Sequence, residues 1–169
     1  MTKVQTVDEI LKRTAIASMV LCAAIWYVSA ATPQDAAKNI MKETGIHGGL
    51  VVHIGCGDGK LTAALRVNDS YLVHGLDTNP QNVATAREKI QSSGVYGDVT
   101  IEQIKKDYLP YVDNSVNLVV GEDLGDVSMD EVMRVLTPEG AAYIRKGGQW
   151  ATISKARPKG MDEWTHYLY

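Results

Sequence analysis

Three glycines at alternate positions and an acid further along the chain are the residues best suited to hold a ligand. Gly55, Gly57 and Gly59 directly follow a short apolar run that ends at Ile54. Glycine accepts positive φ and leaves the main chain bare, so a ligand can lie against backbone N–H groups. Asp77 closes the next apolar run, where an acid in an open parallel sheet accepts hydrogen bonds from ribose hydroxyls. Together these residues predict a site for an adenosyl-type ligand.

Each half of this pattern also has a purely structural explanation. A glycine turn can simply join a strand to a helix, and Asp77 can simply cap the helix that Pro80 predicts. The spacing G-x-G-x-G, with Lys60 and Leu61 next, departs from the G-x-G-x-x-G of dinucleotide-binding folds. The sequence therefore disfavours a dinucleotide-dependent oxidoreductase.

The elements that must position these residues alternate between strand and helix. Apolar runs predict five parallel strands and a final antiparallel one, at residues 50–54, 71–77, 98–104, 116–120, 141–145 and 149–154. Apolar residues at helical spacing predict helices between them, at residues 35–44, 59–67, 80–92 and 128–136. Ser128 and Glu131 have the spacing of a capping box at the start of the last helix. This alternation predicts an α/β domain with a doubly wound, mostly parallel sheet.

Five motifs in this order resemble those of the class I S-adenosylmethionine-dependent methyltransferases. The first is the glycine turn, and the second and third are the ribose strand, Gly75–Pro80, and the adenine loop, Asp107–Tyr111. The last two are the fourth strand, Asn114–Val120, and the helix and turn before the fifth strand, Glu131–Gly140. The resemblance covers roughly residues 48 to 146. It implies a Rossmann-like fold that is abbreviated at its C-terminal end, because the family adds a helix and two strands after strand five.

The resemblance also implies a cofactor, an activity and a set of binding residues. The cofactor would be S-adenosyl-L-methionine, and the activity would be methyl transfer to an unidentified acceptor. The residues that it implies for the methionine, ribose and adenine parts in turn are His53, Gly55, Cys56, Gly57 and Gly59, then Asp77 and Thr78, then Asp107 and Tyr108. The helix at residues 35–44 corresponds to one that covers the cofactor edge in the family.

Two departures from the family pattern support an alternative, a non-catalytic domain with a structural or docking role. His53 stands where the family has an acid that holds the methionine amino group, and Asn117 stands where it often has Asp. His53 can be a ligand residue or a hydrogen-bonded core histidine. No catalytic residue is evident. Glu122 and Asp123, after the fourth strand, are the only candidates for a general base.

Composition excludes several classes of site and partner. The net charge of −3 implies no general attraction to nucleic acid. Cys22 and Cys56 offer neither a disulfide framework nor the spacing of metal ligands, so no metal is expected. Cys56 lies beside a predicted helix N-terminus, which can lower the pKa of a thiol. Its small size is the alternative reason for a cysteine in this loop.

The sequence divides into a leader at residues 1–31, the methyltransferase-like domain at residues 32–155 and a tail at residues 156–169. Ala15–Ala31 is almost wholly apolar but short of the roughly 20 residues of a membrane span. Basic residues before it and small residues at its end predict a signal peptide, and hence an exported protein. The alternative is an N-terminal helix on a cytoplasmic domain. The tail Asp162–Tyr167 resembles the start of a quinoprotein-like propeller region in large exported bacterial proteins.

Overall fold

One six-stranded sheet organises the part of the chain that the computed structural model describes, residues 32–105 and 107–160. The strand order is β3-β2-β1-β4-β5-β6, in which the first five strands are parallel and β6 is antiparallel to β5. The strands are β1 (Gly49–Ile54), β2 (Tyr71–Asp77), β3 (Val99–Gln103), β4 (Val116–Gly121), β5 (Leu136–Lys146) and β6 (Gln149–Ser154). The predicted leader and residues 161–169 of the predicted tail lie outside the described residues.

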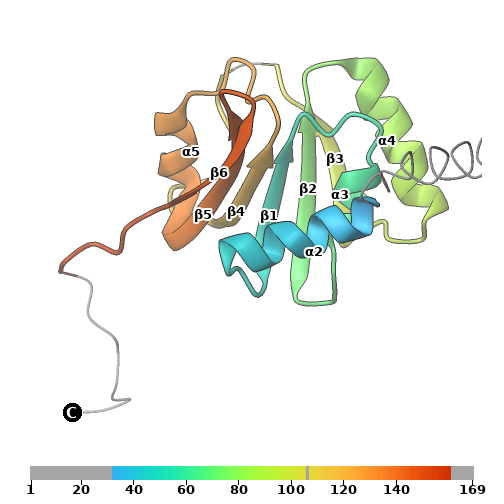
Figure 1. Cartoon of the computed structure of the whole chain (residues 1–169). Coiled ribbons are helices and arrows are strands. Elements are labelled where there is room, and N and C mark those ends of the chain that lie inside the picture. Colours follow the sequence, from blue (N-terminus) through green and yellow to red (C-terminus); the bar gives the residue numbers. More distant parts are fainter. Residues whose placement is uncertain (1–31, 106, 161–169) are drawn as a thin grey trace, which may run out of the picture. The chain divides into compact units, whose positions relative to one another are not determined.

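Helices cover the two faces of the sheet unequally, as Figure 1 shows. One face packs against α2 (Pro33–Thr44), α3 (Lys60–Leu65) and α4 (Pro80–Ser92). The other face packs against α5 (Met129–Val135) and the loop that joins β3 to β4. Alternate residues of β1 pack into the hydrophobic clusters on the two faces of the sheet. Val51 faces the three helices, and Val52 faces α5. No described helix is both long and apolar enough to cross a membrane.

The predicted Rossmann-like architecture is confirmed, and its differences from prediction lie at the ends of elements. Helix α4 has the predicted bounds, with Asn79 as its N-cap and Pro80 in its first turn. Strand β5 begins five residues earlier than predicted, at Leu136. Pro138 and Gly140 do not end it, because Glu139 takes a φ of 67° and the pairing with β4 shifts register around it.

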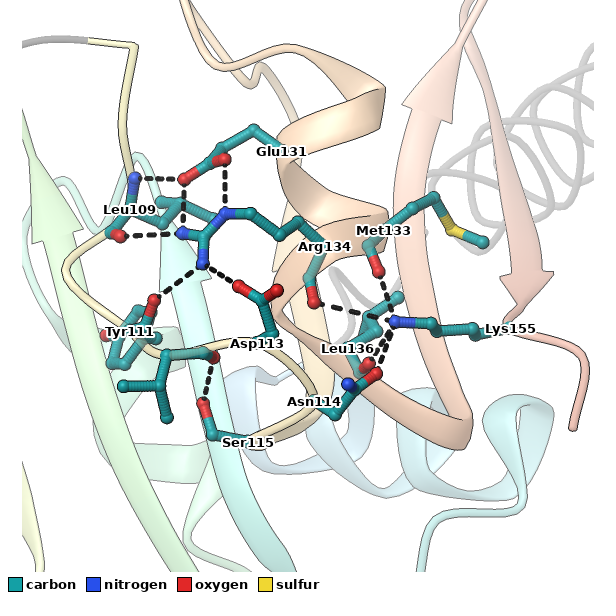
Figure 2. Close-up of polar contacts among 11 residues, drawn as sticks. Leu109, Tyr111, Asp113, Asn114, Ser115, Glu131, Met133, Arg134, Leu136 and Lys155 are labelled. Atoms are coloured by element: carbon teal, nitrogen blue, oxygen red, sulfur yellow. Dashed lines mark hydrogen bonds and ion pairs between the residues drawn. The ribbon is translucent and has the colours of Figure 1, made fainter. Parts of the chain in front are cut away.

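The loop between β3 and β4 contains no helix and is held instead by one arginine of α5 (Figure 2). Arg134 donates to both carboxylate oxygens of Glu131 at 2.7 Å, to Asp113 at 2.7 Å and to the carbonyl of Tyr111 at 2.9 Å. Glu131 in turn accepts a 2.7 Å hydrogen bond from the backbone N–H of Leu109. Charged, multidentate hydrogen bonds of this kind fix the loop without a secondary structure of its own.

The predicted capping box is therefore only half formed. Ser128 does cap α5, accepting a hydrogen bond from the N–H of Glu131 at 3.1 Å. The Glu131 side chain does not return to the cap, because it is occupied by Leu109 and Arg134. At the other end of α5, the ammonium of Lys155 donates to the carbonyls of Met133 and Leu136 (Figure 2). A cation at a helix C-terminus satisfies carbonyls that have no partner within the helix.

Asn117, one of the two departures from the family pattern, lies far from the glycine turn. It stands near the start of β4, where its side-chain oxygen accepts a hydrogen bond from the N–H of Leu50 at 3.0 Å. Gly49 makes room for it: a Cβ there would collide with the Asn117 amide. Asn117 lies beside the start of β1, whereas the glycine turn follows the end of β1. Asn117 is therefore not an argument for or against ligand binding at the turn.

We expect Glu131→Gln to destabilise the protein by about 1–3 kcal/mol at pH 7, because the loop loses its charged anchor. The Arg134 hydrogen bonds hold the pKa of Glu131 below its ordinary value, so this stabilisation exists above the ordinary carboxyl pKa. It is lost as pH falls through the lowered value, so the stabilities of the two proteins should converge in acid below that value. Urea unfolding at several pH values measures this. Asp130→Asn, in the same helical turn but exposed, should change stability by less than about 0.5 kcal/mol; an equal loss in both variants would contradict the assignment.

Candidate functional site

The glycine turn after β1 is joined to the end of β2 by backbone hydrogen bonds. Gly55, Gly57 and Gly59 have φ angles of 74°, 53° and 77°, which L-residues with a side chain rarely adopt. The N–H groups of Gly55 and Cys56 both donate to the carbonyl of Leu76, at 2.8 and 3.1 Å. The predicted strand-turn-helix is thus confirmed, and the turn is fixed in place before any ligand arrives.

The carboxylate of Asp77 sits at the centre of this arrangement, with the residue only 6% exposed. Its Oδ2 accepts from the Gly57 N–H at 3.0 Å and from the Asn82 amide at 3.1 Å, and its Oδ1 accepts from the Asn79 N–H at 2.8 Å. A carboxylate offers about four acceptor positions. Asp77 therefore keeps an acceptor position on Oδ1. The cap of α4 is Asn79 rather than Asp77.

A cavity of about 280 Å³ opens at the carboxyl ends of β1, β2 and β4. Ligands of open α/β sheets bind at such strand ends. Of the predicted site residues, the structure places Gly55, Gly57, Asp77, Thr78 and Asp123 in its lining. No bulky side chain fills the space beside the turn, since a Cβ on Gly57 would meet nothing within 4 Å.

His53 lies under the turn in the core and does not line the cavity. It is 4% exposed, and its Nδ1 lies 2.8 Å from the Thr62 hydroxyl. Burial lowers the pKa of His53 to about 4, although the charge of Asp77 opposes the shift. The imidazole is therefore neutral at pH 7, which favours the hydrogen-bonded core histidine over a cationic ligand residue.

The structure distinguishes the two explanations offered for Cys56. Burial, with the nearby charge of Asp77, raises the pKa of its thiol to about 12. The nearby helix N-terminus does not offset these effects, so the thiol is not activated. A Cβ on Gly75 would lie 3.1 Å from the Cβ of Cys56, which shows how little space there is. Small size explains the cysteine.

The predicted adenine loop is displaced from the cavity. Asp107 and Tyr108 are exposed, and neither lines it. The guanidinium of Arg134 lies over the Tyr108 ring at 4.6 Å from the centroid, so the aromatic is engaged with α5. From this part of the chain, Ile104 lines the cavity instead. A role for Asp107 and Tyr108 in adenine binding stays a prediction.

The two candidate bases are separated by the structure. Glu122 points to Arg145, at 3.9 Å, and does not line the cavity. Asp123 lines it, and its carboxylate accepts a 2.9 Å hydrogen bond from the N–H of Gly125.

Gly59 also lies outside the lining. A Cβ on Gly59 would lie 3.0 Å from the Cα of Ala86, so this glycine lets α3 approach α4.

Sequence reasoning missed several residues that line the cavity. From α4 and from the β4–α5 loop, they are Asn82, Leu124, Gly125, Asp126 and Val127. The position of Asn82 in the first turn of the helix after Asp77 was a usable signal, since that turn begins beside the acid. No residue of α2 lines the cavity, so the expectation that this helix covers the cofactor edge is not met within the described residues.

A doubly wound sheet with a glycine turn after β1 and a buried acid ending β2 is the arrangement of Rossmann-like nucleoside-binding domains, and it fits the class I S-adenosylmethionine-dependent methyltransferases. Comparison with known families agrees. The methyltransferase domain family matches residues 51–140, more than half of the chain, and the chain belongs to this family.

Similar proteins share the fold over part of their length. A demethylmenaquinone methyltransferase of Lactobacillus johnsonii is 30% identical over 131 residues, which cover 72% of this chain and 54% of that protein. The crystal structure of a putative S-adenosyl-L-methionine-dependent methyltransferase from Methanococcus maripaludis is 26% identical, with a TM-score of 0.60, and covers 68% of this chain and 54% of that one. The cyclase SpnF is 22% identical, with a TM-score of 0.59, and covers 66% and 43%. The chain spans about half the length of the first two.

We expect Gly57→Ala and Gly59→Ala to differ in stability although both replace a glycine of positive φ. Gly57→Ala should cost about 1–2 kcal/mol, from backbone strain alone, because its Cβ enters open space. Gly59→Ala should cost about 2–4 kcal/mol, because its Cβ also forces α3 away from Ala86. Urea unfolding of the two variants without ligand measures the difference. Equal losses would show that the third glycine is not needed for packing.

Proposed function

We propose that this domain binds S-adenosyl-L-methionine in the cavity at Asp77 and transfers its methyl group to an acceptor. The observation that carries the proposal is the Asp77 carboxylate, which lines the cavity beside bare backbone at Gly57. Nucleoside recognition needs both, an acceptor for ribose hydroxyls and main chain that a ligand can approach closely. Thr78 and Asn82 line the same part of the cavity and extend its polar wall.

In this proposal the protein acts mainly by positioning. The bound cofactor would supply an electrophilic methyl group on a sulfonium centre. Such a displacement needs alignment of the acceptor more than covalent catalysis. Gly55 and Gly57 would hold the methionine part, and Asp77 the ribose. Asp123, which lines the cavity, is the remaining candidate for accepting a proton from an acceptor.

Calorimetry with S-adenosylmethionine and with S-adenosylhomocysteine tests the proposal. The full chain should bind at micromolar concentration. Asp77→Asn should weaken binding at least tenfold, because a neutral amide is a poorer acceptor for the ribose hydroxyls. Asp69→Asn is the control of equal charge change, since the Asp69 side chain is 95% exposed and lines neither this cavity nor the turn. Unchanged binding in Asp77→Asn would contradict the assignment of the site.

A non-catalytic docking domain is the second candidate, and His53 favours it. The neutral, buried imidazole replaces the acid that holds the methionine amino group in the family. No heat at millimolar S-adenosylmethionine, in a chain that is folded by circular dichroism, would favour the docking domain.

We also propose that the leader at residues 1–31 directs export and is removed, so that the domain at residues 32–155 acts outside the cytoplasm. The apolar run that ends in small residues at Ala30 and Ala31 supports this. Mass spectrometry of the protein expressed in bacteria should find an N-terminus at or near Ala31. Retention of Met1 in all of the protein would reject export by cleavage, and would favour an N-terminal helix on a cytoplasmic domain.

A further inference from the structure

A second and larger cavity, of about 440 Å³, lies between α2, α3 and α4. No residue lines both this cavity and the one at Asp77. Among the described residues, the charged ones that line it are all cationic, namely Lys38, Lys60, Arg66 and Lys89. The whole chain has a net charge of −3, so a cavity lined by cations alone runs against the overall balance. The floor is apolar and includes Ala63, Ala64 and Val95.

The cations of this cavity differ in how far their charge is already neutralised. Lys60 pairs with Asp58 at 2.7 Å, and Arg66 pairs with Asp69 and Asp98 at 2.6 and 2.8 Å. None of these acids lines the cavity. Lys38 and Lys89, from α2 and α4, form no ion pair with any residue in the described ranges. Two exposed ammonium groups, one from each helix, are thus available to an anion in the cavity.

Arg66 provides an independent sign that this cavity is electrostatically incomplete. Both of its ion pairs run through Nη2. Its Nε is buried and lacks a hydrogen-bond partner, and among the described residues it is the only buried side-chain nitrogen or oxygen in that state. A buried donor without a protein partner is costly, so such atoms are rare, and a water, an ion or a ligand group usually satisfies them.

We propose that this cavity binds a phosphate group carried by an amphiphile, namely the headgroup of an anionic phospholipid at a membrane surface. Lys38 and Lys89 would contact the phosphate oxygens, and the alanine and valine floor would contact the adjoining carbon chain. Basic residues attract anionic lipid headgroups. The apolar part of the lining favours a lipid over a soluble phosphate, because Ala63, Ala64 and Val95 offer a surface that a carbon chain would cover and a fully polar phosphate would not.

Cosedimentation of the full chain with vesicles tests this proposal at low ionic strength. The chain should bind vesicles of phosphatidylglycerol and phosphatidylcholine more strongly than vesicles of phosphatidylcholine alone. Lys38→Gln with Lys89→Gln should weaken binding to the anionic vesicles about thirtyfold, roughly fivefold for each lysine. Both side chains are exposed and neither forms an ion pair with another described residue, so the variant should keep its circular dichroism spectrum and melting temperature.

The matched control is Lys146→Gln with Lys159→Gln, which removes the same charge from exposed positions outside the cavity. This variant should bind anionic vesicles nearly as well as the unmodified chain. Equal weakening in both variants would overturn the proposal in favour of general surface charge. Full binding by the Lys38 and Lys89 variant would overturn it as well, since the two lysines would then contribute nothing to lipid binding.

Glycerol 3-phosphate separates a lipid from a soluble ligand. Calorimetry should show weak or no binding of this compound, because it cannot use the apolar floor. Tight binding that is lost in the Lys38 and Lys89 variant would keep the phosphate site but assign it to a soluble phosphate ester. Absence of binding to both the vesicles and the phosphate ester would overturn the site altogether.

Discussion

The hydrogen bond from the Gly57 N–H to the Asp77 carboxylate is the interaction on which the candidate site depends. It joins the turn after β1 to the end of β2, so that the two halves of the sequence pattern become one structure. Parallel pairing of Gly49–Ile54 with the first six residues of β2 brings their carboxyl ends together. Three donors then fix the orientation of the carboxylate. A buried acid with this many partners is expensive to move, and it defines one wall of the cavity before a ligand binds.

The opposite face of the sheet depends on a different kind of interaction. Of the residues that the structure describes, three helices cover one face, whereas the short α5 and the irregular loop between β3 and β4 cover the other. A loop without its own hydrogen-bond ladder needs other partners for its polar groups. Glu131 and Arg134 supply these partners. Glu131 accepts a hydrogen bond from the N–H of Leu109, and Arg134 donates to the carbonyls of Leu109 and Tyr111. The Arg134–Glu131 ion pair on α5 thus satisfies polar groups of the loop that no secondary structure satisfies.

The sequence predicted what depends on local patterns and missed what depends on choice among distant partners. Apolar periodicity and caps such as Asn79 located the strands and helices, because those signals lie within one element. Glycine spacing and Asp77 located the centre of the site for the same reason. Pattern could not show that Glu131 would bond to Leu109 rather than to its own helix cap. Nor could it show that Tyr108 would stack under Arg134 instead of facing the cavity.

The same distinction explains His53 in place of the family's acid. A carboxylate there would be buried beside the Asp77 carboxylate, where desolvation and repulsion between like charges would both oppose its ionisation. A neutral imidazole paired with Thr62 avoids both costs, and so the core gains from the replacement. The methionine end of the site loses an anion in exchange. Under the proposed function, affinity for the cofactor would then depend on Asp77 at the ribose and on the bare main chain at Gly55 and Gly57 beside the methionine part, which gives the carboxylate of Asp77 more weight.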